Sequence, residues 1–405
     1  MRIELPKAVE RFGSVRFGEL QRVFELDSGL ANGANASREQ PIRQVPYEEL
    51  SEIHKRTAIV VPIKGERLKL VEGVLCGIPH PCLIIMVSNS PTRPVDRFHL
   101  EADVLRDFCT FTGKHALLVH QKDPILTTAF EQAGYKEILN RQGRIRDGKA
   151  EGMLIGTLLA SLAGKDYVGF VDADNYFPGA VEEYIREYAA GFAISRSDYS
   201  MVRIAWHSKP KIVESKLFFR KWGRTSSRTN EFLNRLISHY TGFDTEVIKT
   251  GNAGEHALTM ELANTIGYSA GYSIEPNHLI DLLERFGGVI EPPAKSRIKD
   301  QVEVYQIESR NPHLHEAGDQ EHIREMSYQA LSVVYHSRIC PPKLKTELRR
   351  EAVTRGFIEK GTEPTKPHYF PSLNGIDRDR FRASIESTPY GRMAEEEAES
   401  RHRVS

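Results

Sequence analysis

The sequence is poor in cysteine, and this scarcity excludes two classes of protein. Only four of the 405 residues are cysteine, and none of them has the CxxC spacing of a zinc or redox site. Three of the four lie in apolar stretches of sequence, so we expect buried, reduced thiols. A small disulfide-stabilised domain and a cysteine-based zinc site are both excluded by this pattern.

Long apolar runs and an excess of charge of one sign are also absent. The longest apolar runs, residues 82–87 and 152–164, are shorter than the roughly 20 residues that cross a bilayer. The first residues, MRIELPKAVERFG, lack the apolar centre of a signal peptide. Lys plus Arg and Asp plus Glu number 55 each, so no overall field attracts nucleic acid or an anionic membrane. We therefore expect a cytoplasmic protein that binds neither.

What the sequence does contain is most regular between residues 55 and 180. Apolar, β-branched segments typical of buried strands alternate there with helix-like segments of 3.6-residue periodicity. We expect strands at 56–66, 81–90, 115–123 and 167–171, and helices at 67–78 and 151–164. This alternation predicts an α/β fold, a Rossmann-like and mostly parallel sheet with helices on both faces.

Beyond residue 200 the pattern is mixed. Residues 200–210 alternate like an antiparallel strand, and residues 226–242 have helical spacing. Residues 251–268 suggest a glycine-rich loop that opens a second helix, and a charged helix is expected at 343–356. The polar tail, AEEEAESRHRVS, is expected to be frayed or disordered.

Polar residues follow each of the four predicted strands at the point where the strand ends. Ligands of open α/β sheets bind at the carboxyl ends of parallel strands, so these clusters should share one site. The clusters are Lys64–Glu66, Ser88–Ser90, Gln121–Asp123 and Asp172–Asp174.

The two aspartates at the end of the fourth strand admit more than one interpretation. In the plainer one, Asp174 or Asn175 caps the following helix. In the other, an extended backbone projects Asp172 and Asp174 to one side, where a carboxylate can hold Mg²⁺ or Mn²⁺ together with substrate phosphate oxygens. Such a DxD pattern is typical of nucleotide-sugar glycosyltransferases. A phosphatase with Asp172 as its nucleophile is a third possibility, although Asn175-Tyr176 replaces the Gly-Thr pair that usually follows there.

Nine sequence blocks carry a wider resemblance, which extends from about residue 10 to about residue 340. They are VPIKGE, EGVLCGIPH, VSNS, VHQKDP, RIRDGKAEGM, VDADNYFPGAVEEY, RIAWHSKPK, TGNAGEHA and IESRNPHLHE. As a set they resemble the mannosyl-3-phosphoglycerate synthases, retaining glycosyltransferases of the A-type fold. The resemblance implies transfer of α-mannose from GDP-mannose to the 2-hydroxyl of 3-phosphoglycerate, a step of mannosylglycerate (compatible solute) biosynthesis. A related transferase with another nucleotide sugar, such as a glucosyl donor, remains open.

The donor is expected at the strand ends and at the cationic loop before the 151–164 helix. Side chains at the strand ends should face the guanosine: Pro62, Lys64, Glu66, Ser88, Asn89, Gln121 and Lys122. Arg146, Asp147 and Lys149 should lie toward the diphosphate and the sugar, beside a helix N-terminus that favours anions. Asp172 is expected at the ribose or in the water shell of the metal.

The resemblance also implies a metal ligand and an acceptor pocket in the second half of the chain. Asp174 is the first candidate ligand for Mg²⁺ or Mn²⁺, joined by a histidine for which His313 is preferred to His315. The acceptor is anionic, and residues 203–228 contain eight Lys or Arg against one acid, Glu214. The expected acceptor residues are Arg203, Gly251, Asn252, Ala253, Glu255 and His256.

Two mechanisms and a domain division complete these expectations. Glu255 is a conceivable nucleophile for a double displacement, but we favour a front-face route in which the leaving diphosphate accepts the proton of the acceptor. Residues 1–200 should bind the nucleotide sugar, residues 201–340 the acceptor, and residues 341–405 should form a helix and tail without a catalytic role. A homodimer is possible on this basis.

Overall fold

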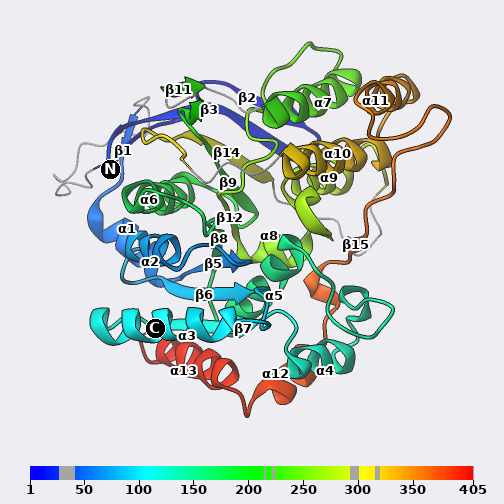
Figure 1. Ribbon diagram of the computed structural model, residues 1–405. Coiled ribbons are helices and arrows are strands. Elements are labelled where there is room, and N and C mark those ends of the chain that lie inside the picture. The colour runs from blue at the N-terminus through cyan, green and yellow to red at the C-terminus, as the bar shows by residue number, and fades with distance from the viewer. Residues whose placement is uncertain (27–41, 214–215, 221–223, 292–300, 315–319, 405) are drawn as a thin grey trace.

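The structure is a computed structural model that describes residues 1–26, 42–213, 216–220, 224–291, 301–314 and 320–404. Among these residues, no helix is both long and apolar enough to cross a membrane. The central element is an 11-stranded sheet with helices on both sides (Figure 1). Its strands run in the order β4-β1-β3-β14-β9-β12-β8-β5-β6-β7, and β2 pairs with β3.

The four strands expected in the first half are confirmed. The strands β8, β5, β6 and β7 are consecutive neighbours in the sheet, and each pair of them is parallel. Their bounds are β5 (Thr57–Ile63), β6 (Leu83–Ser88), β7 (Ala116–His120) and β8 (Tyr167–Phe170). The connecting helices are α2 (Leu68–Gly77), α3 (Arg97–Thr112), α4 (Pro124–Gln132) and α5 (Lys149–Leu162).

The same sheet continues through the second half and the N-terminus. Strand β12 (His256–Thr259) is antiparallel to both β8 and β9 (Ser200–Ala205), whereas β14 (Val302–Glu308) is parallel to β9 and to β3 (Val15–Glu25). The predicted boundary near residue 200 therefore falls within one continuous sheet. The short N-terminal strands were not expected: β1 (Arg2–Glu4), β2 (Val9–Phe12) and β4 (Ile42–Gln44).

Two hydrophobic cores lie on the two faces of the sheet. Successive side chains of β5 alternate between them: Ala58 and Val60 join one core, and Ile59 and Val61 join the other. Helix α5 packs closely on the first face, because a Cβ at Gly156 would lie only 2.4 Å from a side-chain atom of Val60. Helices α1 (Tyr47–Lys55), α2, α3 and α6 (Pro178–Ile194) cover the second face.

The remaining elements extend the first face and the C-terminal side. The helices are α7 (Arg224–Thr241), α8 (Met260–Thr265), α9 (Ile274–Phe286), α10 (Gln320–His336), α11 (Pro342–Thr354) and α12 (Arg378–Ile385). Two small antiparallel pairs join β10 (Lys209–Val213) to β11 (Lys216–Arg220) and β13 (Tyr268–Ser269) to β15 (Tyr369–Phe370). The helices expected at 226–242 and 343–356 are thus confirmed as α7 and α11.

Two expectations were wrong. The loop at 250–255 opens strand β12, not a helix, because His256–Thr259 fill the gap between β8 and β9 and α8 begins only at Met260. The tail that we expected to be disordered forms helix α13 (Pro389–Val404), which packs against α5 and β7 (Figure 1). An ion pair of 2.7 Å between Lys165 and Glu397 fixes this helix to the sheet.

Candidate functional site

The polar ends of β5, β6 and β7 are brought side by side by the sheet register. Ile63 lies opposite Ser88, and Ser88 lies opposite His120. The pairing continues beyond the strands, since the Asn89 N–H donates to the Ile63 carbonyl at 2.7 Å and the Gln121 N–H donates to the Ser88 carbonyl at 2.7 Å. The donor residues expected on these strands therefore gather at one edge.

Neither simple interpretation of the two aspartates matches their backbone. Strand β8 ends at Phe170, and the chain turns at residues 173–174, so it is not extended through Asp174. The residue before α6 is Phe177, and no side chain caps that helix. Instead, the Asn175 amide donates to the Asp172 carbonyl at 2.9 Å and stabilises the turn.

Asp172 is held by a lysine that also contacts the second half of the chain. Lys149 Nζ lies 2.6 Å from Asp172 Oδ1 and 2.9 Å from Glu275 Oε1. Burial opposes the charge of Lys149, but the two carboxylates outweigh it and raise the pKa of Lys149 well above its usual value. A Cβ at Gly254 would lie 2.5 Å from Asp172 Oδ2, so the 250–255 loop abuts the same carboxylate. Sequence reasoning missed Glu275, which only long-range packing brings here.

A third carboxylate lies beside the aspartates. Burial raises the pKa of Glu66, and the negative charges of Asp174 and Asp172 raise it further. Glu66 Oε2 accepts a hydrogen bond of 2.5 Å from the Lys64 N–H. Three acids from two strand ends thus share one small region, with the Lys149 ammonium at its border.

The cationic loop before α5 is joined to the end of β7. The Lys122 and Asp147 side chains form an ion pair of 2.5 Å, and the Gln121 amide donates to the Arg146 carbonyl at 2.7 Å. Burial opposes ionisation of Asp147, yet Lys122 keeps its pKa below the usual value. Helix α5 begins at Lys149, as expected for an anion-binding N-terminus.

Most of the predicted acceptor residues are buried and bonded to the backbone. Arg203 is fully buried, and its guanidinium donates to the Thr250 carbonyl at 2.7 and 3.0 Å and to the Glu275 carbonyl at 3.2 Å. Burial lowers the pKa of Arg203 to about 10. His256 Nδ1 lies 3.0 Å from the Ala253 carbonyl, and burial holds its pKa well below the usual value, so the ring is neutral. These side chains hold the 250–255 loop in place.

Gly251 and Asn252 of the same loop differ in their hydrogen bonding. The Gly251 N–H already donates to Asn230 Oδ1 at 2.7 Å, so this N–H is not available to a ligand. Asn252 is 5% exposed, and neither its amide oxygen nor its amide nitrogen has a hydrogen-bond partner among the described residues. A buried amide without partners is costly, so Asn252 is the loop residue best suited to accept a polar ligand.

Glu255 forms the centre of a buried polar network. Its carboxylate accepts hydrogen bonds from Asn175 Nδ2 at 3.0 Å and from Trp206 Nε1 at 2.9 Å. The ring of His313 stacks on Trp206 with centroids 4.4 Å apart, and His313 Nδ1 lies 3.9 Å from Glu255 Oε1. Sequence reasoning missed Asn175 and Trp206 as parts of the site, although both lie inside motif blocks.

The segment of His313 is tied to the turn of the aspartates. The Tyr176 N–H donates to the Leu314 carbonyl at 3.0 Å, directly after that turn. No set of three or more His, Cys, Asp or Glu side chains in the described part of the chain is arranged to hold a metal ion. His315 lies outside the described residues.

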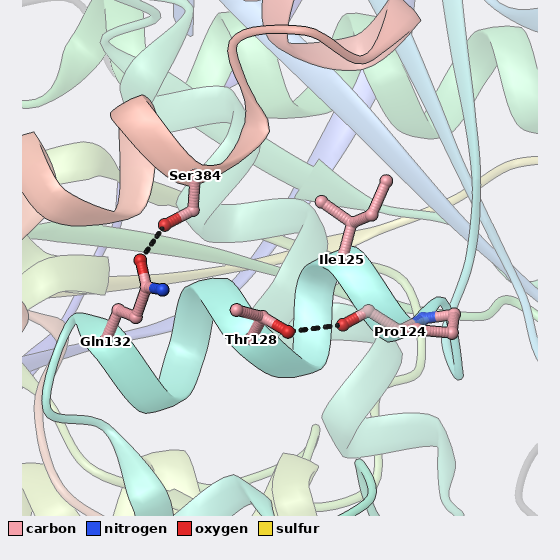
Figure 2. Close-up of a pocket in the computed structure, with 5 residues that line it drawn as sticks. All are labelled: Pro124, Ile125, Thr128, Gln132 and Ser384. Atoms are coloured by element: carbon pink, nitrogen blue, oxygen red, sulfur yellow. Dashed lines mark hydrogen bonds between the residues drawn. The ribbon is translucent and has the colours of Figure 1, made fainter.

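A pocket of about 300 Å³ lies elsewhere, between α4 and α12 (Figure 2). Figure 2 shows the Ser384 hydroxyl and the Gln132 amide joined by a hydrogen bond of 2.7 Å at one end. None of its lining residues is a predicted site residue: Pro124, Ile125, Thr128, Gln132 and Ser384.

Comparison with known proteins gives a consistent set of relatives. The family model described as mannosyl-3-phosphoglycerate synthase matches residues 5–385. A protein of that name from Pyrococcus furiosus is 45% identical over 388 residues, 96% of this chain and 98% of that protein. Another from Aeropyrum pernix is 36% identical over 386 residues, 95% of this chain and 97% of that protein. A crystal structure of glucosyl-3-phosphoglycerate synthase from Mycobacterium tuberculosis with phosphoglyceric acid has a TM-score of 0.48 and 16% identity, covering 80% of this chain and 94% of that one.

Proposed function

This chain belongs to the mannosyl-3-phosphoglycerate synthase family, and from that membership we propose that it transfers α-mannose from GDP-mannose to the 2-hydroxyl of 3-phosphoglycerate. The products are mannosyl-3-phosphoglycerate and GDP, on the route to mannosylglycerate. The observation that carries the proposal is the meeting of Glu66, Asp172 and Lys149 at the carboxyl edge of the parallel strands, directly against the 250–255 loop. A donor site and an acceptor site therefore adjoin.

The donor occupies the edge formed by β5, β6 and β7. The nucleoside lies along the strand ends, and the diphosphate lies toward Arg146 and the N-terminus of α5. Cationic side chains and free backbone amides at a helix N-terminus are the groups that bind phosphate oxygens. The Lys149 ammonium has three N–H groups, and Asp172 and Glu275 use two of them. The third can donate to a substrate between the proposed donor site and the proposed acceptor site.

A divalent cation, Mg²⁺ or Mn²⁺, fits the charges of this edge. The negative charges of Asp174 and Asp172 lie close enough to Glu66 to help raise its pKa, and the three carboxylates together would repel a diphosphate. Such a cation is bound by few protein carboxylates together with phosphate oxygens, which agrees with the absence of a complete cage among the described residues. When bound, it neutralises the charge that develops on the leaving diphosphate. Asp174 is the proposed first ligand, and His313 the second.

Glu255 is proposed to orient groups and not to act as a nucleophile. The side chain is fully buried, and its two oxygens already accept hydrogen bonds from Asn175 and Trp206. A nucleophile must have a free oxygen beneath the anomeric carbon. The arrangement supports a front-face route, in which position and electrostatics supply the rate. Mass spectrometry of the enzyme with GDP-mannose should show no glycosyl adduct, and an adduct on Glu255 would contradict this.

The acceptor is proposed to lie against the 250–255 loop, with Asn252 as its polar contact. Arg203 and His256 then act by holding the loop, since the Arg203 guanidinium and His256 Nδ1 face backbone carbonyls. This proposal differs from our expectation that Arg203 and His256 line the pocket themselves. The cytoplasmic location and a homodimer stay predictions.

Product identification tests the function. The protein is incubated with GDP-mannose, 3-phosphoglycerate and Mg²⁺, and the products are identified by mass spectrometry and NMR. We expect mannosyl-3-phosphoglycerate and GDP. Turnover only in a parallel reaction with UDP-glucose would assign the chain to a different donor. Release of phosphate from sugar-phosphoglycerate without any nucleotide would indicate the phosphatase.

A further inference from the structure

One helix, α3, holds the turn after β5 from two sides. Arg97 Nη2 donates to the Glu66 carbonyl at 2.5 Å and to the Gly65 carbonyl at 3.3 Å. On the other side, the Gly65 N–H donates to Ser90 Oγ at 2.8 Å, and Ser90 Oγ donates to Glu101 Oε1 at 2.6 Å. Residues 97 and 101 are one helical turn apart, so they lie on the same face of α3.

The turn depends on such support. Gly65 has a φ of +83°, in the left-handed region that L-residues with side chains rarely adopt, and a Cβ there would meet nothing within 4 Å. Because Gly65 has no side chain and the space beside it is open, packing does not fix its backbone conformation. Arg97 of α3 bonds the carbonyls of residues 65 and 66 directly, and Glu101 of α3 reaches the amide of residue 65 through the Ser90 hydroxyl.

The buried acid in this arrangement is costly to keep. Glu101 is 0% exposed and Ser90 is 2% exposed, and Glu101 Oε2 has no hydrogen-bond partner among the described residues. An apolar residue of similar size at position 101 would pack against the β6–β7 side without that penalty. Helix α3 is also fixed at its start, where the Asp96 side chain caps it by accepting from the His99 N–H at 3.0 Å.

We propose that Arg97 and Glu101 are positioning residues for the donor, acting through the 64–66 turn without touching the substrate. The inference rests on the proposed function, which places the nucleoside at this turn. Through Glu66 the turn also adjoins Asp172 and Asp174. A displaced turn should therefore weaken donor binding and leave the 250–255 loop, and with it the acceptor, unaffected.

The connection that runs from Glu101 through Ser90 to the Gly65 amide can be removed at either side chain. Glu101→Leu and Ser90→Ala remove the support of the Gly65 amide, and each should raise the KM for GDP-mannose about tenfold, with the KM for 3-phosphoglycerate unchanged. Glu101→Gln keeps an oxygen that accepts from Ser90, so its KM for GDP-mannose should stay within about twofold of that of the unmodified protein. The double variant of Ser90 and Glu101 should be no worse than either single one, because both belong to one network.

A matched control lies on the same helix. Arg106 and Asp103 form an exposed ion pair on α3 that does not reach the turn. Arg106→Gln should leave both KM values unchanged. Thermal melting of every variant separates a local effect from loss of folding, and Ser90→Ala, the smallest change, decides the question if Glu101→Leu folds poorly.

Calorimetric binding of GDP with Mg²⁺ separates this inference from the function on which it rests. If the unmodified protein binds no GDP, the proposed function fails and this inference fails with it. If the unmodified protein binds GDP and well-folded Ser90→Ala binds it equally tightly, the function stands and the positioning role is overturned. Weaker GDP binding by Ser90→Ala and Glu101→Leu, with recovery in Glu101→Gln, is the result expected.

Discussion

The edge formed by β5, β6 and β7, proposed for the donor, and the 250–255 loop, proposed for the acceptor, use charge in opposite ways. They are called the donor edge and the acceptor loop below. At the donor edge, Lys122 and Asp147 pair while their side chains remain 40% and 61% exposed. In and beside the 250–255 loop, Arg203, Glu255 and His256 are all fully buried and bonded within the protein. Exposed charges can exchange their partners for a ligand, whereas buried ones hold a shape because an unpaired buried charge is expensive. Under the proposed function, charge would bind the donor and a fixed loop would select the acceptor.

The largest expected effect breaks the donor side. Asp174→Asn keeps the size of the side chain but removes the charge offered to the metal, so turnover should fall about a thousandfold or more. Stability should change little, because Asp174 lies in a partly exposed turn. Steady-state rates with Mg²⁺ and chemical denaturation measure the two properties. Asp198→Asn, at an exposed bend, is the control and should behave like the unmodified protein. Near-normal turnover of Asp174→Asn would end the metal interpretation.

The next largest effect concerns Arg203, the buried residue that holds the 250–255 loop. Arg203→Lys keeps the charge but loses the fork that reaches both the Thr250 and the Glu275 carbonyls, and the Thr250 carbonyl then keeps the Ala253 N–H as its donor. The free energy of unfolding should fall by about 2 to 4 kcal/mol. Among the molecules that remain folded, the KM for 3-phosphoglycerate should rise while the KM for GDP-mannose stays constant. A rise confined to the donor KM would contradict the division between the two regions.

The sequence allowed much of the donor edge to be predicted and little of the acceptor loop. Apolar strands that end in polar residues are local signals, and they identified Lys64–Glu66, Ser88–Ser90 and Asp172–Asp174 correctly as neighbours in space. Glu275 and Trp206 reach the site through contacts between distant parts of the chain, which no local pattern records. Strand β12 was expected to be helix, since its His-Ala-Leu-Thr run has no strand signature and its place between β8 and β9 decides its conformation.

The smallest expected effect concerns the exposed Lys122–Asp147 pair at the donor edge. Lys122→Ala removes a cation from the donor edge, and the KM for GDP-mannose should rise a few-fold, more than the KM for 3-phosphoglycerate. The free energy of unfolding should change by about 1 kcal/mol or less, because exposed ion pairs contribute little. Lys136→Ala is the matched control, since Lys136 forms a similarly exposed pair with Glu131 away from the strand ends. An unchanged donor KM would remove Lys122 from the site.

Binding of GDP with and without a divalent cation tests the central claim most directly. Glu66 lies within reach of the charges of Asp172 and Asp174, at the edge proposed for the donor, so the nucleotide should bind well only when a cation offsets their charge. Calorimetry with Mg²⁺ present, and again after removal of metal by EDTA, should give a Kd at least about tenfold lower with the cation. Equal affinity in the two titrations would contradict the account, because the carboxylates would then have no role in holding the donor.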